Sequence, residues 1–510
     1  MRMSSSRFTA AGLGTAIVVA LAIMTGTQLR AAATPAPLAD AMKARDAVRV
    51  EALLKQKADV NVAQADGTTA LHWAAYWDDL PLVQRLLSAG AQVAAQNRYK
   101  ETPLSLAAAN ANARVIEALL NAGARADSTS GEGETVLMTV ARKGNVEAVK
   151  TLLAHGANVN AREAWHQQTA LMWAAGEDNV AIVKMLLEAG AQVDAVAEGG
   201  FTALHYAARN GGNESGKLLV TAGADVNRAI VGGMSPLMMA AVNASYELAA
   251  TLVGWGADVN DNAMGFSVLH QLVWSYHPPV SFYAPGPELK NKSGNVDAMQ
   301  LFKILLDYGA NPNARQERQH PGGYKLGQIG DFSGITPLML AARFQDVDLM
   351  KLLLNYGADP TDVTDNNTNL LMVAAGLTAF LGEMPSTRPG SYMETVKLAW
   401  DLCKCDVNEQ NGHGWTALHA AVNREGDDAI RFLASKGARF DIKNYEEDIS
   451  FPWRGEGKTP LRLAEGNFAA MSYKYFCNQQ VTLREVMGLP KAECVRIPPY
   501  ETKALRGGDQ

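Results

Sequence analysis

The segment TALHWAAYWDDLPLVQRLLSAGAQV, residues 69–93, decides the fold because altered copies of it recur through most of the chain. The copies begin TPLSLAA at 102, TVLMTVA at 135, TALMWAA at 169, TALHYAA at 202, SPLMMAA at 235, SVLHQLV at 267, TPLMLAA at 336, NLLMVAA at 369, TALHAAV at 416 and TPLRLAE at 459. Each copy opens with Thr, Ser or Asn, whose side-chain oxygen can accept a hydrogen bond from a free N–H in the first turn of a helix. Several copies continue with Pro, for example Pro103 and Pro337, where a missing N–H does no harm. We therefore expect a first helix to begin at this point in every copy.

A second helix follows the first in each copy. The paired Ala residues of the first helix allow close approach of a second helix with sequences such as VIEALL and IVKMLL. The second helix ends at a Gly, such as Gly90 or Gly190, which suits a left-handed C-terminal cap. One such pair cannot bury its apolar face alone, whereas pairs stacked on both sides share one thin core. The sequence therefore predicts an elongated stack of helix, turn, helix and loop units.

These residues resemble the ankyrin-repeat family, whose signature is T-P-L-H-x-A at a period of about 33 residues. The resemblance covers residues 38–470 and about twelve units. It implies an all-α solenoid with short β-finger loops, in which the first helices line a concave face. It also implies a structural role, with hydrogen bonds around the cap and finger, for the fourth residue of the signature, which here is His72, His205, His270 and His419.

Several segments depart from the repeated unit. Lys57 and Lys404 occupy the position of the capping Gly, and a left-handed conformation costs a side chain about 1 kcal/mol there. Pro- and Gly-rich insertions are expected near residues 275–294, 314–333, 376–392 and 445–457. They can either add to a binding face or fold back over neighbouring units. Residues 471–510 lack the unit and are predicted to form a C-terminal cap and tail.

The N-terminus has the pattern of a secretory signal peptide. Arg2 and Arg7 precede the apolar stretch AAGLGTAIVVALAIMTG, and small residues follow at Ala31 and Ala33. We expect residues 1–33 to be removed, with residues 34–37 as a short linker to the solenoid. A retained inner-membrane anchor is the alternative, because the apolar stretch is close to the length that spans a bilayer. The predicted location is periplasmic or secreted.

The chain has a net charge of −6 and lacks the clustered basic residues that are typical of proteins that bind nucleic acid or an anionic membrane surface. Four cysteines lie in the last quarter of the chain, at Cys403, Cys405, Cys477 and Cys494. Three pairings are possible. Export would allow disulfides, and our hypothesis is that Cys403 and Cys405 bond across to Cys477 and Cys494. A metal site at the Cys-Lys-Cys stretch is the other interpretation, although no His is spaced to complete it.

Candidate contact residues follow from the resemblance to the family. It places the residues after the paired small residues of the first helix in the concave groove, and those just before each cap on the fingers. The types expected to anchor a partner there are aromatic residues and basic residues, above all Arg. Packing against the next finger is the alternative for each one. The candidates are Tyr76, Trp77, Tyr99, Arg142, Lys143, Trp165, Phe201, Arg209, Trp274, Arg343, Phe344, Trp415 and Arg424.

The sequence favours a non-enzymatic protein that binds a protein partner through the concave groove and fingers. We expect a monomer without cofactor or metal, and without nucleic-acid or membrane binding once the signal peptide is removed. One alternative is a metal-binding or catalytic protein whose site is built from the late insertions, with His277, His320 and the cysteines. Another is an effector secreted beyond the cell, which would share the fold. The identity of the partner is open, and support of an exported redox enzyme is one hypothesis.

Overall fold

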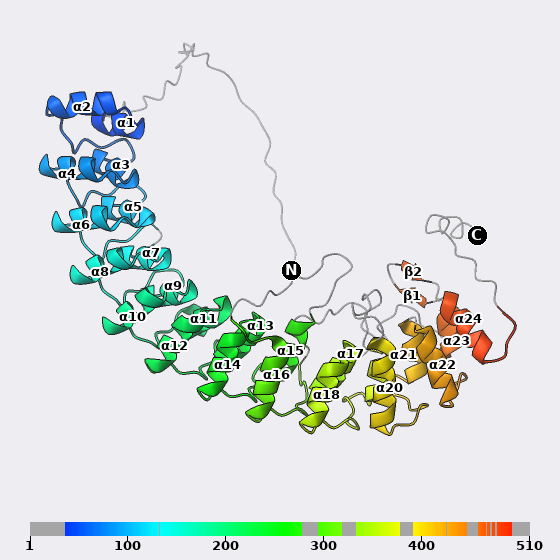
Figure 1. Ribbon diagram of the computed structural model, residues 1–510. Helices are drawn as coiled ribbons and strands as arrows, with labels where there is room; N and C mark the ends of the chain where they lie inside the picture. Colours follow the sequence, from blue (N-terminus) through cyan, green and yellow to red (C-terminus); the bar gives the residue numbers. More distant parts are fainter. Residues whose placement is uncertain are drawn as a thin grey trace, which may run out of the picture.

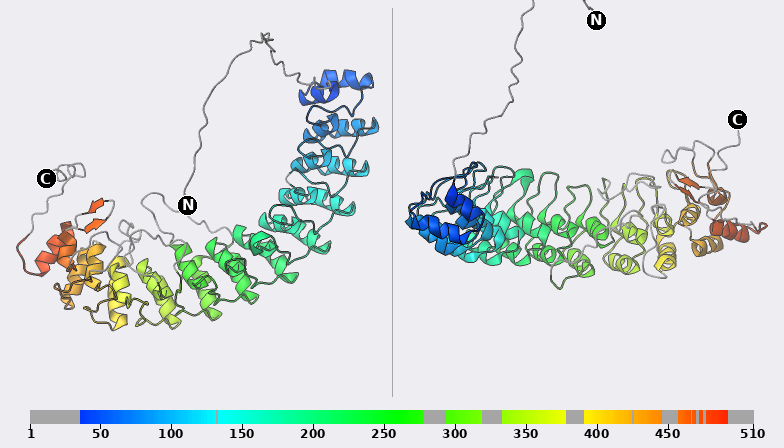
Figure 2. Two further views of the ribbon diagram at one scale, coloured as in Figure 1. Left: turned by 180° about the vertical axis from the view of Figure 1, so that it is seen from behind. Right: turned by 90° about the horizontal axis from the view of Figure 1, so that it is seen from above.

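The computed structural model describes residues 36–131, 133–277, 294–318, 333–377, 391–424, 426–445, 457–465, 467–469, 472–474 and 477–491. Within these ranges the chain is a curved stack of helix pairs that runs from α1 at one end to α24 at the other (Figure 1). Odd-numbered helices contact one another along the inner side of the curve, and even-numbered helices contact one another along the outer side (Figures 1 and 2). The predicted all-α solenoid is confirmed.

The helices that form the stack are short and evenly sized. The inner helices are α1 (Pro37–Lys43), α3 (Ala70–Tyr76), α5 (Pro103–Asn110), α7 (Val136–Lys143), α9 (Ala170–Gly176), α11 (Ala203–Asn210), α13 (Pro236–Val242), α15 (Val268–Tyr276), α17 (Pro337–Arg343), α19 (Leu370–Ala375), α21 (Ala417–Asn423) and α23 (Pro460–Glu465). The outer helices are α2 (Ala47–Lys55), α4 (Leu80–Ser88), α6 (Ala113–Asn121), α8 (Val146–Ala154), α10 (Val180–Glu188), α12 (Asn213–Thr221), α14 (Tyr246–Gly254), α16 (Ala298–Asp307), α18 (Val347–Asn355), α20 (Ser391–Cys403), α22 (Asp427–Ser435) and α24 (Cys477–Val486). A 3-10 helix, η1 (Glu198–Gly200), lies between α10 and α11. Strands β1 (Asn467–Ala469) and β2 (Ser472–Lys474) form an antiparallel hairpin before α24.

The inner helices begin at the predicted caps. The Thr416 hydroxyl lies 2.9 Å from Nδ1 of His419, which accepts from the Thr416 N–H at 3.2 Å. The other ring nitrogen of His419 lies 3.0 Å from the Lys458 carbonyl oxygen in the next finger. Because the backbone donates to Nδ1, the proton of the neutral ring sits on Nε2 and is donated to that carbonyl. Burial lowers the pKa of His419 to about 4, so the ring is neutral at pH 7. His419 is structural, as the resemblance implies.

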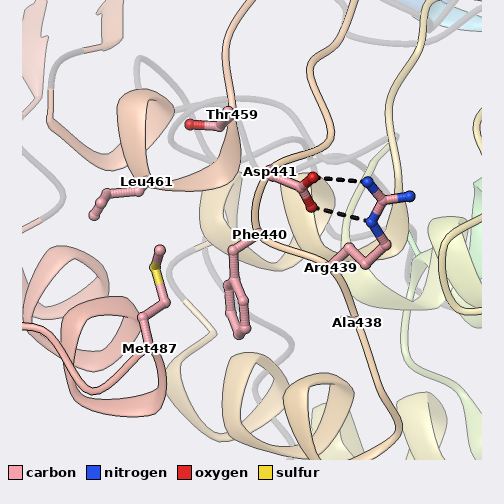
Figure 3. A pocket seen from close by; sticks show the side chains of 7 residues that line it. All are labelled: Ala438, Arg439, Phe440, Asp441, Thr459, Leu461 and Met487. Carbon is pink, nitrogen blue, oxygen red and sulfur yellow. Dashed lines mark hydrogen bonds and ion pairs between the residues drawn. The ribbon is translucent and has the colours of Figure 1, made fainter.

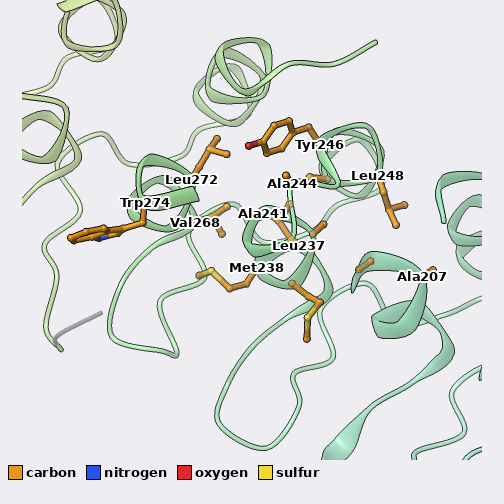
Figure 4. Packing of buried hydrophobic residues seen from close by; sticks show 14 of the residues in the cluster. Ala207, Leu237, Met238, Ala241, Ala244, Tyr246, Leu248, Val268, Leu272 and Trp274 are labelled. Carbon is orange, nitrogen blue, oxygen red and sulfur yellow. The ribbon is translucent and has the colours of Figure 1, made fainter. Parts of the chain in front are cut away.

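Small residues allow the helix layers to approach closely. Figure 4 shows Leu248 of α14 among the buried residues of neighbouring helices, including Leu237 of α13 and Leu272 of α15. Leu248 packs so closely on α12 that a Cβ at Gly216 would lie 2.6 Å from its Cδ1. Gly216 therefore leaves the space that Leu248 fills. The thin core continues in this way from unit to unit.

Hydrogen bonds from an Asn in the loop after the outer helix, as in ADVN at residues 58–61, join several units to the next. Asn160 donates from Nδ2 to the Gly190 carbonyl oxygen at 3.0 Å and accepts from the Gln192 N–H at 2.8 Å. The same pair of bonds is made by Asn61, Asn227, Asn260, Asn313 and Asn408. The fingers are linked as well, since the Glu198 N–H donates to the His166 carbonyl oxygen at 2.7 Å. These links satisfy backbone groups that the short helices leave unpaired.

Left-handed residues end the outer helices. Gly190 has φ of +87° with open space where a Cβ would stand, so the dihedral angle and not crowding requires Gly. Lys57 and Lys404 adopt the same left-handed conformation, with φ of +53° and +51°. Both junctions thus keep the geometry of the cap without its usual residue.

The predicted disulfide connectivity is wrong for Cys403 and Cys405, because these residues are bonded to each other. The intervening Lys404 turns the chain in its left-handed conformation and brings the two Cα atoms to 5.1 Å, which suits a disulfide. The bond therefore closes the turn after α20 and does not reach Cys477. The Cys477 side chain and Cys494 lie outside the described part of the chain.

Other predictions concern residues that the structure does not describe. The signal peptide, residues 1–33, is among them, and so are most residues of the insertions near 275–294, 314–333, 376–392 and 445–457. The cap predicted after residue 470 is described in part, and α24 packs against α22 and α23. Across the described ranges, none of the helices combines the length and the apolar character that a bilayer span requires.

Candidate functional site

The last turns of the inner helices form one row along the concave side of the stack. The eighth residue of each unit, counted from the N-cap, lies in this row, for example Tyr76 after Thr69 and Trp274 after Ser267. The row differs along its length, because Tyr76 is 44% exposed and Trp274 is 5% exposed. We call the part from α1 to α11 the open stretch and the part from α15 to α21 the closed stretch.

Aromatic rings cluster at the beginning of the open stretch. The Trp77 ring stacks on Trp73 with centroids 6.0 Å apart, and Tyr76 meets both rings edge-on. Two side-chain hydrogen bonds hold the Trp73 ring in place. Its Nε1 donates to Gln64 at 2.9 Å, and Gln64 in turn donates to Asp40 at 2.7 Å. Hydrogen-bonded rings of this kind offer large apolar area and have little conformational freedom left to lose on binding.

Cations lie over aromatic rings along the open stretch. The guanidinium carbon of Arg45 lies 3.6 Å from the Trp77 ring centroid, and that of Arg142 lies 4.3 Å from the Trp173 centroid. The same arrangement joins Arg209 to Tyr206 at 5.0 Å and the Lys43 ammonium to Trp73 at 5.8 Å. We call this surface the cationic–aromatic face, defined by Lys43, Arg45, Trp73, Tyr76, Trp77, Arg142, Lys143, Trp173, Tyr206 and Arg209.

One finger beside this face has its own supporting carboxylate. Glu163 is buried and accepts hydrogen bonds from the backbone N–H groups of Trp165, His166 and Gln168 at 2.6 to 3.0 Å. Burial raises the Glu163 pKa, but these hydrogen bonds outweigh it, so the pKa lies below its usual value. The ionised carboxylate thus holds a turn that leaves Trp165 73% exposed. Such an exposed indole on a fixed turn suits a contact with a partner.

The closed stretch uses the same row for internal contacts. The Phe344 ring stacks on His277 at 5.1 Å and meets Trp274 edge-on at 5.4 Å. The His277 ring donates from Nε2 to the buried Asp346 carboxylate at 2.9 Å, and Asp346 also caps α18. The Arg343 guanidinium lies over both the Trp274 and Phe344 rings. These groups are therefore engaged with one another across neighbouring units.

A second internal contact follows further along the closed stretch. The Arg424 guanidinium lies 5.5 Å from the centroid of the Tyr392 ring, whose hydroxyl donates to the Ala375 carbonyl oxygen at 3.0 Å. Gly376 makes room for Arg424, since a Cβ at Gly376 would lie 2.6 Å from the Arg424 Cβ. Burial raises the pKa of Tyr392 above its usual value. The hydroxyl is therefore neutral and donates its proton.

The structure separates the predicted contact residues into three groups. Exposed residues are Tyr76, Tyr99, Arg142, Lys143, Trp165 and Arg209. Half-buried residues are Trp77, Phe201, Phe344 and Arg424. Trp274 and Arg343, expected in the groove, and Trp415, expected on a finger, are buried, so the alternative of packing within the stack applies to these three. For Trp274 the reason is the contact with Phe344, and the Trp415 ring lies against His419 with centroids 5.7 Å apart.

Five residues of the cationic–aromatic face were not predicted from the sequence. Trp73, Trp173 and Tyr206 occupy the position four residues after the N-cap, where the signature has no fixed residue. Lys43 and Arg45 belong to the first, truncated unit, which lacks the opening signature. Comparing the fifth residue of every copy would have shown a second inward-facing row, because one helical turn separates it from the row of Tyr76.

The alternative metal site has no support in the described residues. His277 is paired with Asp346, and His320 lies outside the described ranges. In the ranges that the structure does describe, His, Cys, Asp and Glu form no cluster of three or more that could hold a metal.

A hollow of about 600 Å³ lies near the C-terminal end of the stack (Figure 3). Phe440, Leu461 and Met487 form its apolar side, and Arg439 pairs with Asp441 at 2.7 Å on the other. The hydrogen bonds from Arg439 lower the pKa of Asp441. The ionisable groups of this hollow therefore satisfy each other.

Comparison with known proteins identifies the repeat. A family model described as "Ankyrin repeats (3 copies)" matches residues 10–97, 38–130, 104–197 and 190–263, and one described as "Ankyrin repeat" matches 333–366 and 413–445. Among curated relatives, Alpha-latroinsectotoxin-Lt1a of Latrodectus tredecimguttatus is 26% identical over 28% of this chain and 9% of its own length. BCL-6 corepressor-like protein 1 of Homo sapiens is 27% identical over 26% of this chain and 7% of its own length. The alignments thus span less than a tenth of these curated relatives.

Two solved structures are similar to part of this chain. The human ASB11 ankyrin repeat domain is 29% identical with a TM-score of 0.37, and covers 40% of this chain and 92% of its own. The ankyrin repeat domain of Bcl-3, a member of the IkappaB protein family, is 30% identical with a TM-score of 0.37, and covers 40% and 94%. Such repeats are generally interaction modules without enzymatic activity. The family models together match more than half of this chain, and the chain belongs to the ankyrin-repeat family.

Proposed function

We propose that this protein binds a protein partner through the open stretch of its concave face, as a scaffold without catalytic activity. The observation that carries the proposal is the exposure of Tyr76 against the Trp73 and Trp77 rings, together with the exposure of Trp165 on a turn held by Glu163. Aromatic residues and Arg dominate the energetics of protein interfaces because they remove large areas from water. Exposed groups of this type gathered on one face are typical of a binding surface.

The location of the protein is part of the proposal. The basic N-terminal residues, the apolar stretch and Ala33 support export to the periplasm after cleavage. The measurement is cell fractionation followed by N-terminal sequencing of the mature chain, which we expect to begin at Thr34. Recovery of the intact N-terminus in the membrane fraction would instead support the retained anchor.

The test of partner binding compares two tyrosines on opposite layers. Tyr76 lies on the inner layer at 44% exposure, and Tyr308 caps outer helix α16 at 59% exposure. We expect Tyr76→Ala to weaken capture of the native partner by about 1–3 kcal/mol, since exposed aromatic anchors contribute this much to an interface. Quantitative mass spectrometry of proteins retained by the full chain from a native extract identifies the partner, and calorimetry with that partner measures its affinity.

The matched control is Tyr308→Ala, which removes the same side chain from the outer layer and is expected to leave affinity unchanged. Both variants should retain the helical content of the parent, because neither ring is buried. Loss of affinity in Tyr308→Ala with full affinity in Tyr76→Ala would place binding on the outer layer and contradict the proposal.

A further inference from the structure

The cationic–aromatic face has a charge opposite to that of the whole chain. The chain has a net charge of −6, yet Lys43, Arg45, Arg142, Lys143 and Arg209 are all exposed on this one face. Exposed carboxylates adjoin this face at Asp78, directly after Trp77, and at Glu177, directly after the row position Gly176. A local surplus of cations on an acidic protein indicates a surface selected for a negatively charged partner.

The carboxylates that border this face are used internally. Asp40 accepts from Gln64 at 2.7 Å, and Glu101 accepts from the Gly131 N–H at 3.1 Å. Glu163 accepts from the backbone N–H groups of its own finger. Glu101 and Glu163 therefore support the fingers, and Asp40 supports the Gln64 side chain that holds Trp73.

The cations, in contrast, make few polar contacts, and Arg209 uses only its Nε, which donates to Asn210 Oδ1 at 3.4 Å in the contacts described. Among the described residues, Arg142 is paired with Glu134 at 3.7 Å, whereas Arg45 and Arg209 make no ion pair. A guanidinium that stacks on a ring uses its face, and its N–H donors point outward in the plane of the group. Such donors match the two oxygens of a carboxylate, and the neighbouring rings match apolar side chains.

We propose that the partner segment bound by the open stretch is an acidic, extended peptide in which Asp or Glu alternates with apolar residues. This proposal rests on the proposed function and adds the chemistry of the partner. Arg142 and Arg209 lie two units apart, which is about 20 Å at the usual spacing of packed helices. An extended chain covers this distance in about six residues.

The experiment measures binding of labelled peptides of roughly 16 residues to the full chain by fluorescence anisotropy, a length that spans the face when extended. One peptide repeats Glu-Leu-Glu-Pro, and its control repeats Gln-Leu-Gln-Pro. We expect the Glu peptide to bind about tenfold more tightly than the Gln peptide or better, with an affinity that falls as salt is added. Equal affinity of the two peptides, or tighter binding of a single-stranded DNA oligonucleotide, would overturn the proposal.

Variants locate the binding. The double variant Arg142→Gln and Arg209→Gln should weaken binding of the Glu peptide about tenfold or more, because it removes two positive charges and their paired guanidinium donors. The control, Arg49→Gln and Arg114→Gln, removes the same charge from exposed positions on outer helices α2 and α6 and should have no effect. The reversed variant, Arg142→Glu and Arg209→Glu, places two carboxylates beside the remaining cations and should lose the preference for the Glu peptide over one that repeats Lys-Leu-Lys-Pro. Equal losses in the inner and outer variants would show a non-specific charge effect and contradict the proposal.

The two proposals fail in different ways. If Tyr76→Ala weakens capture of the native partner and the Glu and Gln peptides bind alike, the proposal of an acidic partner is wrong. The proposal that a partner binds the open stretch would still stand. If Tyr76→Ala has no effect on the native partner, the proposed function itself is wrong.

Discussion

The open and closed stretches use one repeated position in opposite ways. Tyr76 and Trp274 occupy the same place in their units, yet the first ring is exposed and the second is buried against Phe344. In the open stretch, cations and rings of the row present their surfaces outward. In the closed stretch, His277, Phe344 and Arg343 pack on one another and on Trp274. A shared fold therefore leaves the same position exposed in one region, where we propose that a partner binds, and uses it for contacts between units in the other.

The largest effect on stability should come from replacing Trp274 by Ala, and the matched variant Tyr76→Ala shows the contrast between the two stretches. Trp274→Ala removes a buried ring and is expected to reduce the local free energy of unfolding by about 3–5 kcal/mol. Tyr76→Ala should cost under about 0.5 kcal/mol, because its ring is exposed. Native-state hydrogen exchange resolves the two regions separately, which suits a repeat stack whose units need not unfold together. Similar losses in both variants would remove the distinction between the stretches.

Acid should destabilise both stretches, because each contains a buried histidine. Burial lowers the pKa of His205 in the open stretch and of His419 in the closed stretch to about 4, from an ordinary value of 6.5. Below pH 6.5 the unfolded chain takes up protons that the folded chain does not, so the free energy of unfolding falls as the pH falls. Each His should lower the free energy of unfolding by about 2 kcal/mol at pH 5 relative to neutral pH.

Hydrogen exchange at pH 6.5 and 5 tests this expectation, after correction for the intrinsic exchange rate. Comparable losses around α11 and α21 would show that the scaffold is the same in both stretches and that the difference lies in the surface. A constant free energy of unfolding over this interval would contradict the burial of neutral rings.

The helix caps should also respond alike in the two stretches. Gly190 and Gly357 both have φ of +87° and open space where a Cβ would stand. Val at either position should cost about 1–2 kcal/mol, because a β-branched residue disfavours the left-handed conformation. Thermal unfolding of the two variants measures the cost, and a much larger loss at one position would show that its cap has a further role. Ala at the same positions should cost less than Val.

The smallest effect should be a gain at the first junction. Lys57 adopts the left-handed conformation with φ of +53°, so Lys57→Gly should relieve strain. The greater freedom of Gly in the unfolded chain offsets part of this relief, and we expect a net gain of about 0.5 kcal/mol. Hydrogen exchange of α2 checks it. Any loss of stability would indicate that the Lys57 side chain contributes contacts that outweigh its strain.

Much of the fold could be predicted from the sequence because its determinants lie within one unit. The N-cap Thr, the His three residues later and the left-handed Gly act over a few residues, and each was found at its expected place. The disulfide between Cys403 and Cys405 could not be foreseen in the same way, since it depends on the turn that Lys404 adopts. Half of the cationic–aromatic face was also not predicted, because Trp73, Trp173 and Tyr206 lie where the signature is variable and Lys43 and Arg45 lie in the truncated first unit.

The sequence by itself determined the unit, its register and the positions that point toward the concave side, because local hydrogen bonds and backbone angles fix them. Only the tertiary structure decided which of those positions remain open. Exposure of Tyr76 and burial of Trp274 depend on the side chains that the neighbouring unit supplies, such as Phe344, which is 70 residues away in the chain. Packing between units sets that outcome, and a residue's own unit does not encode it.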